Sequence, residues 1–316
     1  MSIVWPSFIL YCIVIFILLY KRRRIEQFRS PFFVIILAQA FSEICLFLHV
    51  ELVMRPRKYR LFPWIPVDNS SLHKYLYFWH SLLRATIILQ YIPMAANRYT
   101  SFYFIARHIG FWSTRVVLVI VSLCWTLAAV ILIPIFYNSY SRVSLVYASN
   151  TTGILIMTAN KELTSADVIS CVTIDMSVVC ICTLFYFLIW KKMKQQAKMN
   201  IGIRRYKKEE MAILACCLSA FVIACVETVD SVLLYTAQAI RSERLTLIAL
   251  DLWFYITEMT CCAKPWILLA TYDRLRTHVL SLFSCGDNDD HKPKQCLRPP
   301  TMCSLHNTAS HAAATI

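Results

Sequence analysis

Seven long apolar runs divide this chain, and short polar segments rich in Lys and Arg follow several of them. Each run has about 18 or more mostly apolar residues, the length at which a helix crosses the hydrocarbon core of a bilayer. The runs are Ile3–Tyr20, Phe32–Val53, Tyr75–Ala96, Val116–Tyr137, Val168–Trp190, Met211–Ala237 and Leu247–Thr271. The pattern therefore predicts an all-α fold, a seven-transmembrane helix bundle.

Composition supports a membrane protein rather than a soluble one. The chain is 58% hydrophobic, and only 16% of its residues are charged, against about 25% in soluble domains. The net charge of +14 would suggest nucleic acid in a soluble protein. Here the basic residues flank apolar runs, where they orient helices and face anionic lipid, so we expect the bilayer and no nucleic acid as partner.

The distribution of basic residues predicts the orientation. Segments 21–31, 97–115 and 191–210 and the tail after Thr271 hold 21 Lys and Arg residues, against 9 in segments 54–74, 138–167 and 238–246. Cytoplasmic loops carry the excess, so the amino terminus is predicted outside and the carboxyl terminus inside. The basic segment 55–60 argues against this orientation.

Two N-glycosylation sequons agree with the predicted orientation. Asn69-Ser70-Ser71 and Asn150-Thr151-Thr152 both fall in segments that the charge bias places outside. The amino terminus has no basic segment before its first apolar run, so we expect no cleavable signal peptide, and the first helix serves as its own insertion signal.

Charged residues inside the runs mark a candidate ligand site, because charges at membrane depth tend to face the bundle interior. Arg84 is the candidate cation. The acids predicted in the outer half are Asp175, Glu227, Asp230 and Asp251, and the predicted aromatic walls are Trp79, Tyr91, Trp253 and Tyr255. Asp251, Tyr255 and Glu258 follow one stripe of the seventh helix. A second interpretation stays open, in which Arg84 pairs with Asp251 or Glu227 only to hold helices together.

The third run ends in Asn97-Arg98-Tyr99, which suggests a switch at the inner face. Arg98 is placed to pair with Glu209 or Glu210 at the start of the sixth helix. Breaking that pair would let the sixth helix swing out, which is the kind of two-state element a switch needs. The alternative is that Arg98 is a basic anchor at the membrane surface that only fixes the topology. Pro93 should bend the third helix near this end.

The end of the chain carries a short amphipathic segment. Leu275, Val279, Leu282 and Phe283 fall on one helical face, which predicts a helix on the membrane surface. Cys285 follows it and is a candidate for palmitoylation. We expect residues 1–284 to form the receptor domain and residues 285–316 a disordered cytoplasmic tail.

Catalytic and metal-binding patterns are missing from the sequence. No two cysteines fall in predicted external loops, no Cys or His cluster has the spacing of a metal site, and no Ser/His pair or paired acid motif suggests an enzyme. We therefore expect no external disulfide, no metal, no cofactor and no enzymatic activity.

Several short motifs resemble one family. They are the very short segment before the first run, Ser30-Pro31-Phe32-Phe33 opening the second, Gln39 to Glu43 within it, Arg55-Pro56-Arg57-Lys58-Tyr59 after it, and Asn97-Arg98-Tyr99. With them, residues 1–285 resemble the nematode serpentine chemoreceptors of the class gamma (Srg) superfamily, most closely class V (Srv). The resemblance implies a protein like a G-protein-coupled receptor, in the plasma membrane of sensory neurons and their cilia, that binds an environmental ligand.

The chain departs from the wider rhodopsin-like pattern at several positions. Asn97 replaces the usual acid before the arginine, Lys264-Pro265 replaces Asn-Pro, and Leu268 replaces a tyrosine. The cysteines of the usual disulfide between the third helix and the second external loop are absent. These departures put the sodium site and the standard activation contacts in doubt, but not the topology.

Together these features predict an orphan receptor that binds a small molecule on its outer side and couples to a heterotrimeric G protein. Arg84, Asp251 and Glu227 are the main ligand candidates, and Arg98, with Tyr99, is the switch candidate. The alternative is a transporter or channel component, in which the buried acids and Lys264 form an ion path. Spans with few glycines and no evident two-half repeat argue against it.

Overall fold

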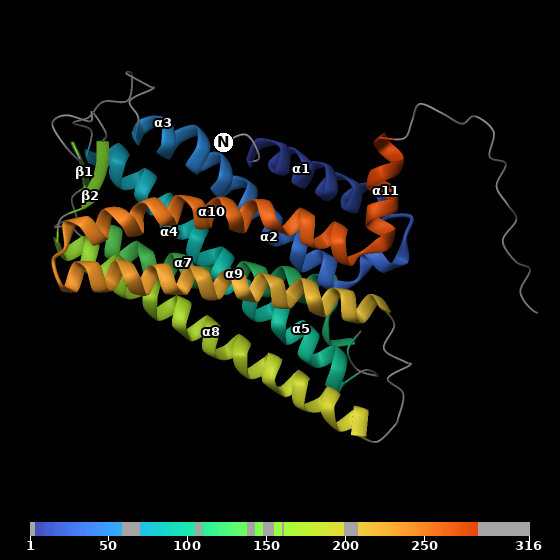
Figure 1. Cartoon of the computed structure of the whole chain (residues 1–316). Coiled ribbons are helices and arrows are strands. Elements are labelled where there is room, and N and C mark those ends of the chain that lie inside the picture. The colour runs from blue at the N-terminus through green and yellow to red at the C-terminus, as the bar shows by residue number, and fades with distance from the viewer. Residues whose placement is uncertain are drawn as a thin grey trace, which may run out of the picture.

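The protein is described here as a computed structural model that covers residues 4–58, 70–104, 108, 110–137, 143–147, 155–159, 161–198 and 208–283. Long helices lie side by side in a bundle (Figure 1). The helices are α1 (Val4–Lys21), α2 (Pro31–His49), α3 (Arg55–Lys58), α4 (Ser70–Leu89), α5 (Tyr91–Tyr103), α7 (Thr114–Phe136), α8 (Lys161–Lys198), α9 (Lys208–Ala239), α10 (Glu243–Thr271) and α11 (Asp273–Phe283). A 3₁₀ turn, Glu26–Arg29, precedes α2, and a π-helical turn, Val50–Met54, joins α2 to α3.

The described helices confirm the predicted bundle. Six of them are long and apolar enough to cross a membrane, namely α1, α2 with its π turn, α7, α8, α9 and α10. The remaining predicted span is divided into α4 and α5 at Gln90, whose backbone stays right-handed at φ −69° and ψ −12°. Pro93 has no amide hydrogen to donate to the Leu89 carbonyl, which explains an interruption at this place.

The starts of the helices follow signals in the sequence. Pro31 occupies the first turn of α2, where a missing amide hydrogen costs nothing. The Ser113 hydroxyl accepts a hydrogen bond from the Val116 amide at the start of α7, and Ser242 does the same for Leu245 at the start of α10. Such caps satisfy amide groups that have no partner within the helix.

The span formed by α4 and α5 lies in the middle of the bundle. It packs against α2, α7, α8 and α9, whereas α1 packs mainly against α10 and α11. By contrast, α7 leaves many large apolar side chains exposed, among them Leu118, Val119, Leu123, Leu127 and Val130. Such a surface suits lipid and not water. Many polar residues on α4 and α5 are therefore enclosed by protein.

A small β hairpin is the part of the fold that the sequence did not predict. Strands β1 (Val143–Tyr147) and β2 (Leu155–Ala159) pair antiparallel, with Val143 opposite Ala159 and Tyr147 opposite Leu155. The hairpin contacts α4 and α8 at one end of the bundle, and α11 lies at the other end (Figure 1). We call these the hairpin end and the α11 end.

The last described helix agrees with the amphipathic pattern. Leu275 and Val279 are buried in the main hydrophobic core, and Arg276 pairs with Asp273 on the exposed side. The side chains of Leu282 and Phe283 lie outside the described residues, as do Asn69, Asn150, Cys285 and the tail. Glycosylation, palmitoylation and tail disorder therefore stay predictions.

Candidate functional site

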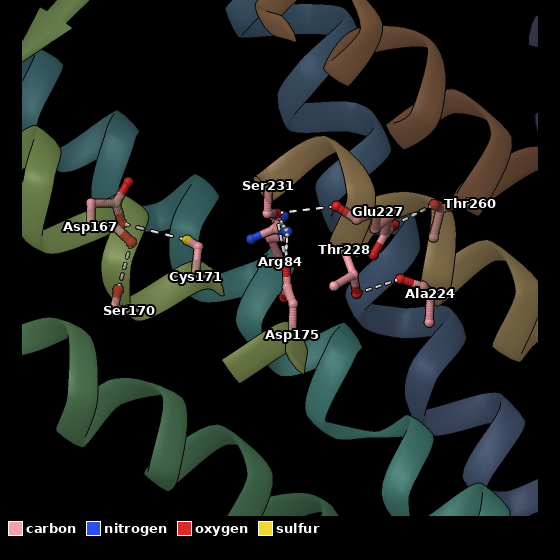
Figure 2. Close-up of polar contacts among 10 residues, drawn as sticks. All are labelled: Arg84, Asp167, Ser170, Cys171, Asp175, Ala224, Glu227, Thr228, Ser231 and Thr260. Carbon is pink, nitrogen blue, oxygen red and sulfur yellow. Dashed lines mark hydrogen bonds and ion pairs between the residues drawn. The ribbon is translucent and has the colours of Figure 1, made fainter. Parts of the chain in front are cut away.

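Arg84 on α4 is the centre of a polar cluster inside the bundle (Figure 2). Its Nη2 atom donates to Asp175 Oδ2 on α8 at 2.5 Å and to Ser231 Oγ on α9 at 2.7 Å. The Ser231 hydroxyl also lies 2.6 Å from the same Asp175 oxygen. One guanidinium thus joins three spans, and a charge-assisted bond of this kind is about twice as strong as a neutral one.

Two acids of α9 extend the cluster. Glu227 and Asp230 are buried, and their spacing of three residues places them on one side of the helix. Glu227 Oε1 accepts a hydrogen bond of 2.5 Å from Thr260 Oγ1 on α10. Both acids lie within electrostatic reach of Arg84. Asp175, Glu227 and Asp230 thus lie near Arg84, and their predicted role in ligand binding stays a prediction.

A second hydrogen-bonded group lies beside this cluster, between α4 and α8. The Tyr77 hydroxyl donates to Asp167 Oδ2 at 2.6 Å, and the Cys171 thiol lies 3.9 Å from Asp167 Oδ1. Asp167 is buried and within electrostatic reach of Arg84. The sequence reasoning missed Asp167, because it placed this acid in the external loop before the fifth span.

Asp251 and Tyr255 do not join the cluster, and the prediction that they face the interior was wrong. Asp251 is exposed, and Tyr255 is 68% exposed, both on the outer surface of α10. The buried stripe of α10 instead holds Thr257, Thr260, Cys261, Lys264 and Leu268. Asp251 and Tyr255 thus lie away from the side that packs, whereas Glu258 of the same predicted stripe is partly buried and pairs with Arg55.

The aromatic residues predicted as walls are dispersed. Trp79 packs against Trp125 of α7, with ring centres 6.5 Å apart. Trp253 meets the His80 ring edge to face at 4.5 Å. Tyr91 is buried on α5, beside Lys264 rather than Arg84. Within the described residues, the contacts of these rings do not bring them together around Arg84.

The ion pair expected for Arg98 is present, at the other end of the span that carries Arg84. The Arg98 Nη1 atom donates to Glu210 Oε2 at 3.1 Å, which links the last turns of α5 to the first turn of α9. The Nη2 atom donates to Asn97 Oδ1 at 2.6 Å, and the guanidinium lies 4.9 Å from the centre of the Phe32 ring. Glu209, the other expected partner, has its side chain outside the described residues.

Comparisons with known proteins decide the family. Residues 1–285 match the model of the serpentine type 7TM GPCR chemoreceptor family Srv. The chain belongs to this family. Among solved structures, the crystal structure of squid rhodopsin is similar, with a TM-score of 0.64 over 92% of this chain and 87% of that chain at 16% identity. That likeness concerns the fold alone. No curated protein sequence matches the chain.

The chemoreceptor carries a further buried ion pair that the sequence analysis did not foresee. Lys264 Nζ on α10 donates to Glu43 Oε1 on α2, and the Tyr11 hydroxyl of α1 donates to Glu43 Oε2 at 2.5 Å. The Lys264 ammonium also lies 5.4 Å from the centre of the Tyr91 ring. Side chains from three spans thus meet at one buried carboxylate, and α5 joins them through the contact between Tyr91 and Lys264.

A third ionic contact ties α10 of the chemoreceptor to the far end of the second span. Arg55 pairs with Glu51 one turn earlier, at 3.0 Å, and with Glu258 on α10. The same guanidinium lies 5.8 Å from the centre of the Phe254 ring. The sequence had assigned Arg55 to a loop, where it counted against the predicted orientation. In the structure it also holds two helices together.

Two side chains that follow α5, those of His108 and Trp112, are hydrogen-bonded to Thr100 of α5. Trp112 Nε1 donates to Thr100 Oγ1 at 2.7 Å, and His108 Nδ1 lies 3.1 Å from the same oxygen. Burial and the nearby positive charge of Arg98 lower the pKa of His108 to about 4. The imidazole is therefore neutral at pH 7, which suits a position beside a guanidinium.

Tyr99 belongs to an aromatic group at the same end. Its ring centre lies 4.5 Å from that of Tyr103 and 5.4 Å from that of Phe185 on α8. These contacts pack α5 against α8 and leave Arg98 facing α9. In the part of the chain that the structure describes, no group of three or more His, Cys, Asp or Glu residues is arranged to hold a metal ion.

Proposed function

We propose that this chemoreceptor binds a small environmental molecule near Arg84 and activates a heterotrimeric G protein at the α11 end of the bundle. The family match and the rhodopsin-like fold support a receptor in general. The observation that carries the proposal is the Arg98–Glu210 ion pair, because it joins the ends of two spans that must separate for the bundle to open.

The energetics of that pair suit a switch. The Arg98 side chain is 4% exposed, but the Glu210 side chain is 42% exposed. Glu210 can therefore pass into water when α9 moves, and Arg98 keeps Asn97 and Phe32 as partners. A partly exposed ion pair contributes about 1 kcal/mol or less. Ligand binding that favours the open state by 1–3 kcal/mol, a usual coupling energy, is sufficient to shift the equilibrium.

The Arg84 cluster is the proposed ligand end. It lies on the same span as Arg98 and joins that span to α8 and α9. A molecule that changes the bonds of Arg84 or Ser231 therefore acts on α9, the same helix that carries Glu210 in its first turn. This shared helix is a physical connection between the two sites.

We further propose that the hairpin end lies outside the cell and the α11 end in the cytoplasm of a sensory neuron, at the plasma membrane. The excess of Lys and Arg in segments 21–31 and 191–210 supports this orientation. The basic segment before α9 also suits an acidic partner surface or anionic lipid.

The test is G-protein nucleotide exchange by the full chain in lipid nanodiscs, across a panel of volatile and water-soluble small molecules. Arg98→Ala should raise basal exchange and reduce the further rise on ligand addition, with the protein still folded, because α9 is no longer held by its partner on α5. Equal responses from Arg98→Ala and the unmodified receptor would remove the switch assignment. Ligand-evoked ion current or uptake in liposomes without G protein would favour the transporter alternative.

A further inference from the structure

The cluster around Arg84 holds more acids than its one guanidinium can pair. Asp175 takes the direct ion pair, and Glu227 and Asp230 remain within electrostatic reach. Asp167 adds a fourth carboxyl about two turns earlier on α8. Burying a carboxylate costs free energy unless a cation or hydrogen-bond donors compensate it. The arrangement is therefore short of positive charge.

Individual carboxyl oxygen atoms in the cluster lack hydrogen-bond donors. Asp175, Glu227 and Asp230 are 1%, 8% and 7% exposed. Each has one carboxyl oxygen that is buried and accepts no hydrogen bond from the described residues, namely Asp175 Oδ1, Glu227 Oε2 and Asp230 Oδ1. Buried acceptors without a donor are rare in proteins and call for an explanation.

We propose that these acids are the anchor for an organic ammonium ligand, a protonated amine. This inference rests on the proposed function and names the ligand class of the same site. A primary ammonium has three N–H donors, which equals the number of carboxyl oxygens left without one. Glu227 and Asp230 share one side of α9 and serve as the main anchor.

Arg84 has a different role in this arrangement. Its Nη2 atom is already bonded to Asp175 and Ser231, so it holds α4, α8 and α9 in register. A carboxylate ligand bound at another N–H group of Arg84 would face Asp175, Glu227 and Asp230. Like charges at such distances repel. The site therefore selects cations over anions of the same shape.

The experiment measures the melting temperature of the full chain in nanodiscs at pH 7 with matched probes. The probes are primary amines of two to eight carbons, including 2-phenylethylamine, and the alcohols and carboxylates of the same carbon skeletons. The amines are protonated at this pH. Asp230→Asn and Glu227→Gln keep the shape of each side chain and remove the charge. Asp251→Asn is the matched control, because Asp251 is an exposed acid outside the cluster.

We expect at least one amine to raise the melting temperature, and its alcohol and carboxylate to have much weaker effects. Asp230→Asn and Glu227→Gln should each reduce the affinity for the amine by about 10- to 100-fold, the usual cost of a lost charge-assisted hydrogen bond. The Asp251→Asn variant should bind the amine with unchanged affinity. The inference is overturned if no amine stabilises the receptor, if the carboxylates stabilise it equally, or if both cluster variants retain full amine affinity.

The same proteins separate this inference from the proposed function. Amine binding that depends on Asp230, without any G-protein activation, leaves the ammonium site standing and contradicts the coupling. Activation of the G protein by neutral or anionic molecules alone supports the receptor and contradicts the ammonium site.

Discussion

Arg98 near the end of α5 and Glu210 at the start of α9 form an ion pair of 3.1 Å across the bundle. The two residues are 112 positions apart, and the pair couples the central span to the helix that also carries Glu227 and Ser231. Because the Glu210 carboxylate is partly in contact with solvent, the pair can open at modest cost. It is the feature from which the proposed signalling follows.

Replacing Arg84 alone should destabilise the receptor more than replacing Arg84 and Asp175 together. Arg84→Gln leaves Asp175 buried without its cation, which costs about 3–5 kcal/mol. The double variant Arg84→Gln, Asp175→Asn should recover part of that loss, because no unpaired charge remains at the pair. Thermal unfolding in nanodiscs measures the difference. Additive losses in the double variant would show that the two residues do not interact.

The buried contact between Lys264 and Glu43 should behave in the same way. Lys264→Met removes the cation from the buried Glu43 carboxylate and leaves the hydrogen bond from Tyr11, so we expect a loss of about 3–5 kcal/mol. Tyr11→Phe removes one hydrogen bond to a charged group and should cost about 1.5–3 kcal/mol. Melting temperatures of the two single variants check this order. A smaller loss for Lys264→Met than for Tyr11→Phe would contradict it.

These pairs also show how far the sequence could predict the structure. Apolar runs determine where helices form, because each run must be buried in lipid or protein, and all seven were found. The Arg98–Glu210 pair was predictable because both residues lie at helix ends on the same predicted face of the membrane. Lys264 and Glu43 are 221 positions apart on different helices, and no local pattern indicates that they meet.

The errors at Asp251 and Tyr255 have a physical reason. Spacing shows which residues share a stripe of a helix, but the rotation of that helix is set by its neighbours. Packing against α9, α1 and α2 buries the stripe with Thr260 and Lys264 instead. The hairpin was missed because two strands of five residues inside a loop give a weak signal beside long apolar runs.

His108 predicts a pH dependence of stability. The pKa of its imidazole is about 4 in the folded protein, against an ordinary value of 6.5, because burial and Arg98 disfavour the charged form. The unfolded chain therefore binds the proton more tightly between these values, and folding is weakened as the pH falls from about 6.5 toward 4. His108→Gln should reduce the loss of melting temperature between pH 7 and pH 5. An identical loss in the variant would contradict the assignment.

Glycosylation tests the proposed orientation. If the hairpin end is outside, Asn69 and Asn150 are open to modification in the secretory pathway, and glycosidase treatment should increase the mobility of the receptor on a gel. Asn69→Gln together with Asn150→Gln should abolish that change. A new sequon placed in segment 199–207 should stay unmodified, and its modification would reverse the orientation.

The most direct test of the account is basal G-protein nucleotide exchange by purified receptor in nanodiscs, with Glu210→Gln compared with the unmodified chain. Gln keeps the size of the side chain and removes the charge that holds Arg98. The account predicts about a two- to fivefold rise in basal exchange, the equivalent of losing an ion pair of 1 kcal/mol or less. Asp273→Asn, which breaks the exposed pair with Arg276 at the same end of the bundle, should leave exchange unchanged. Equal basal exchange from Glu210→Gln and the unmodified receptor would contradict the account.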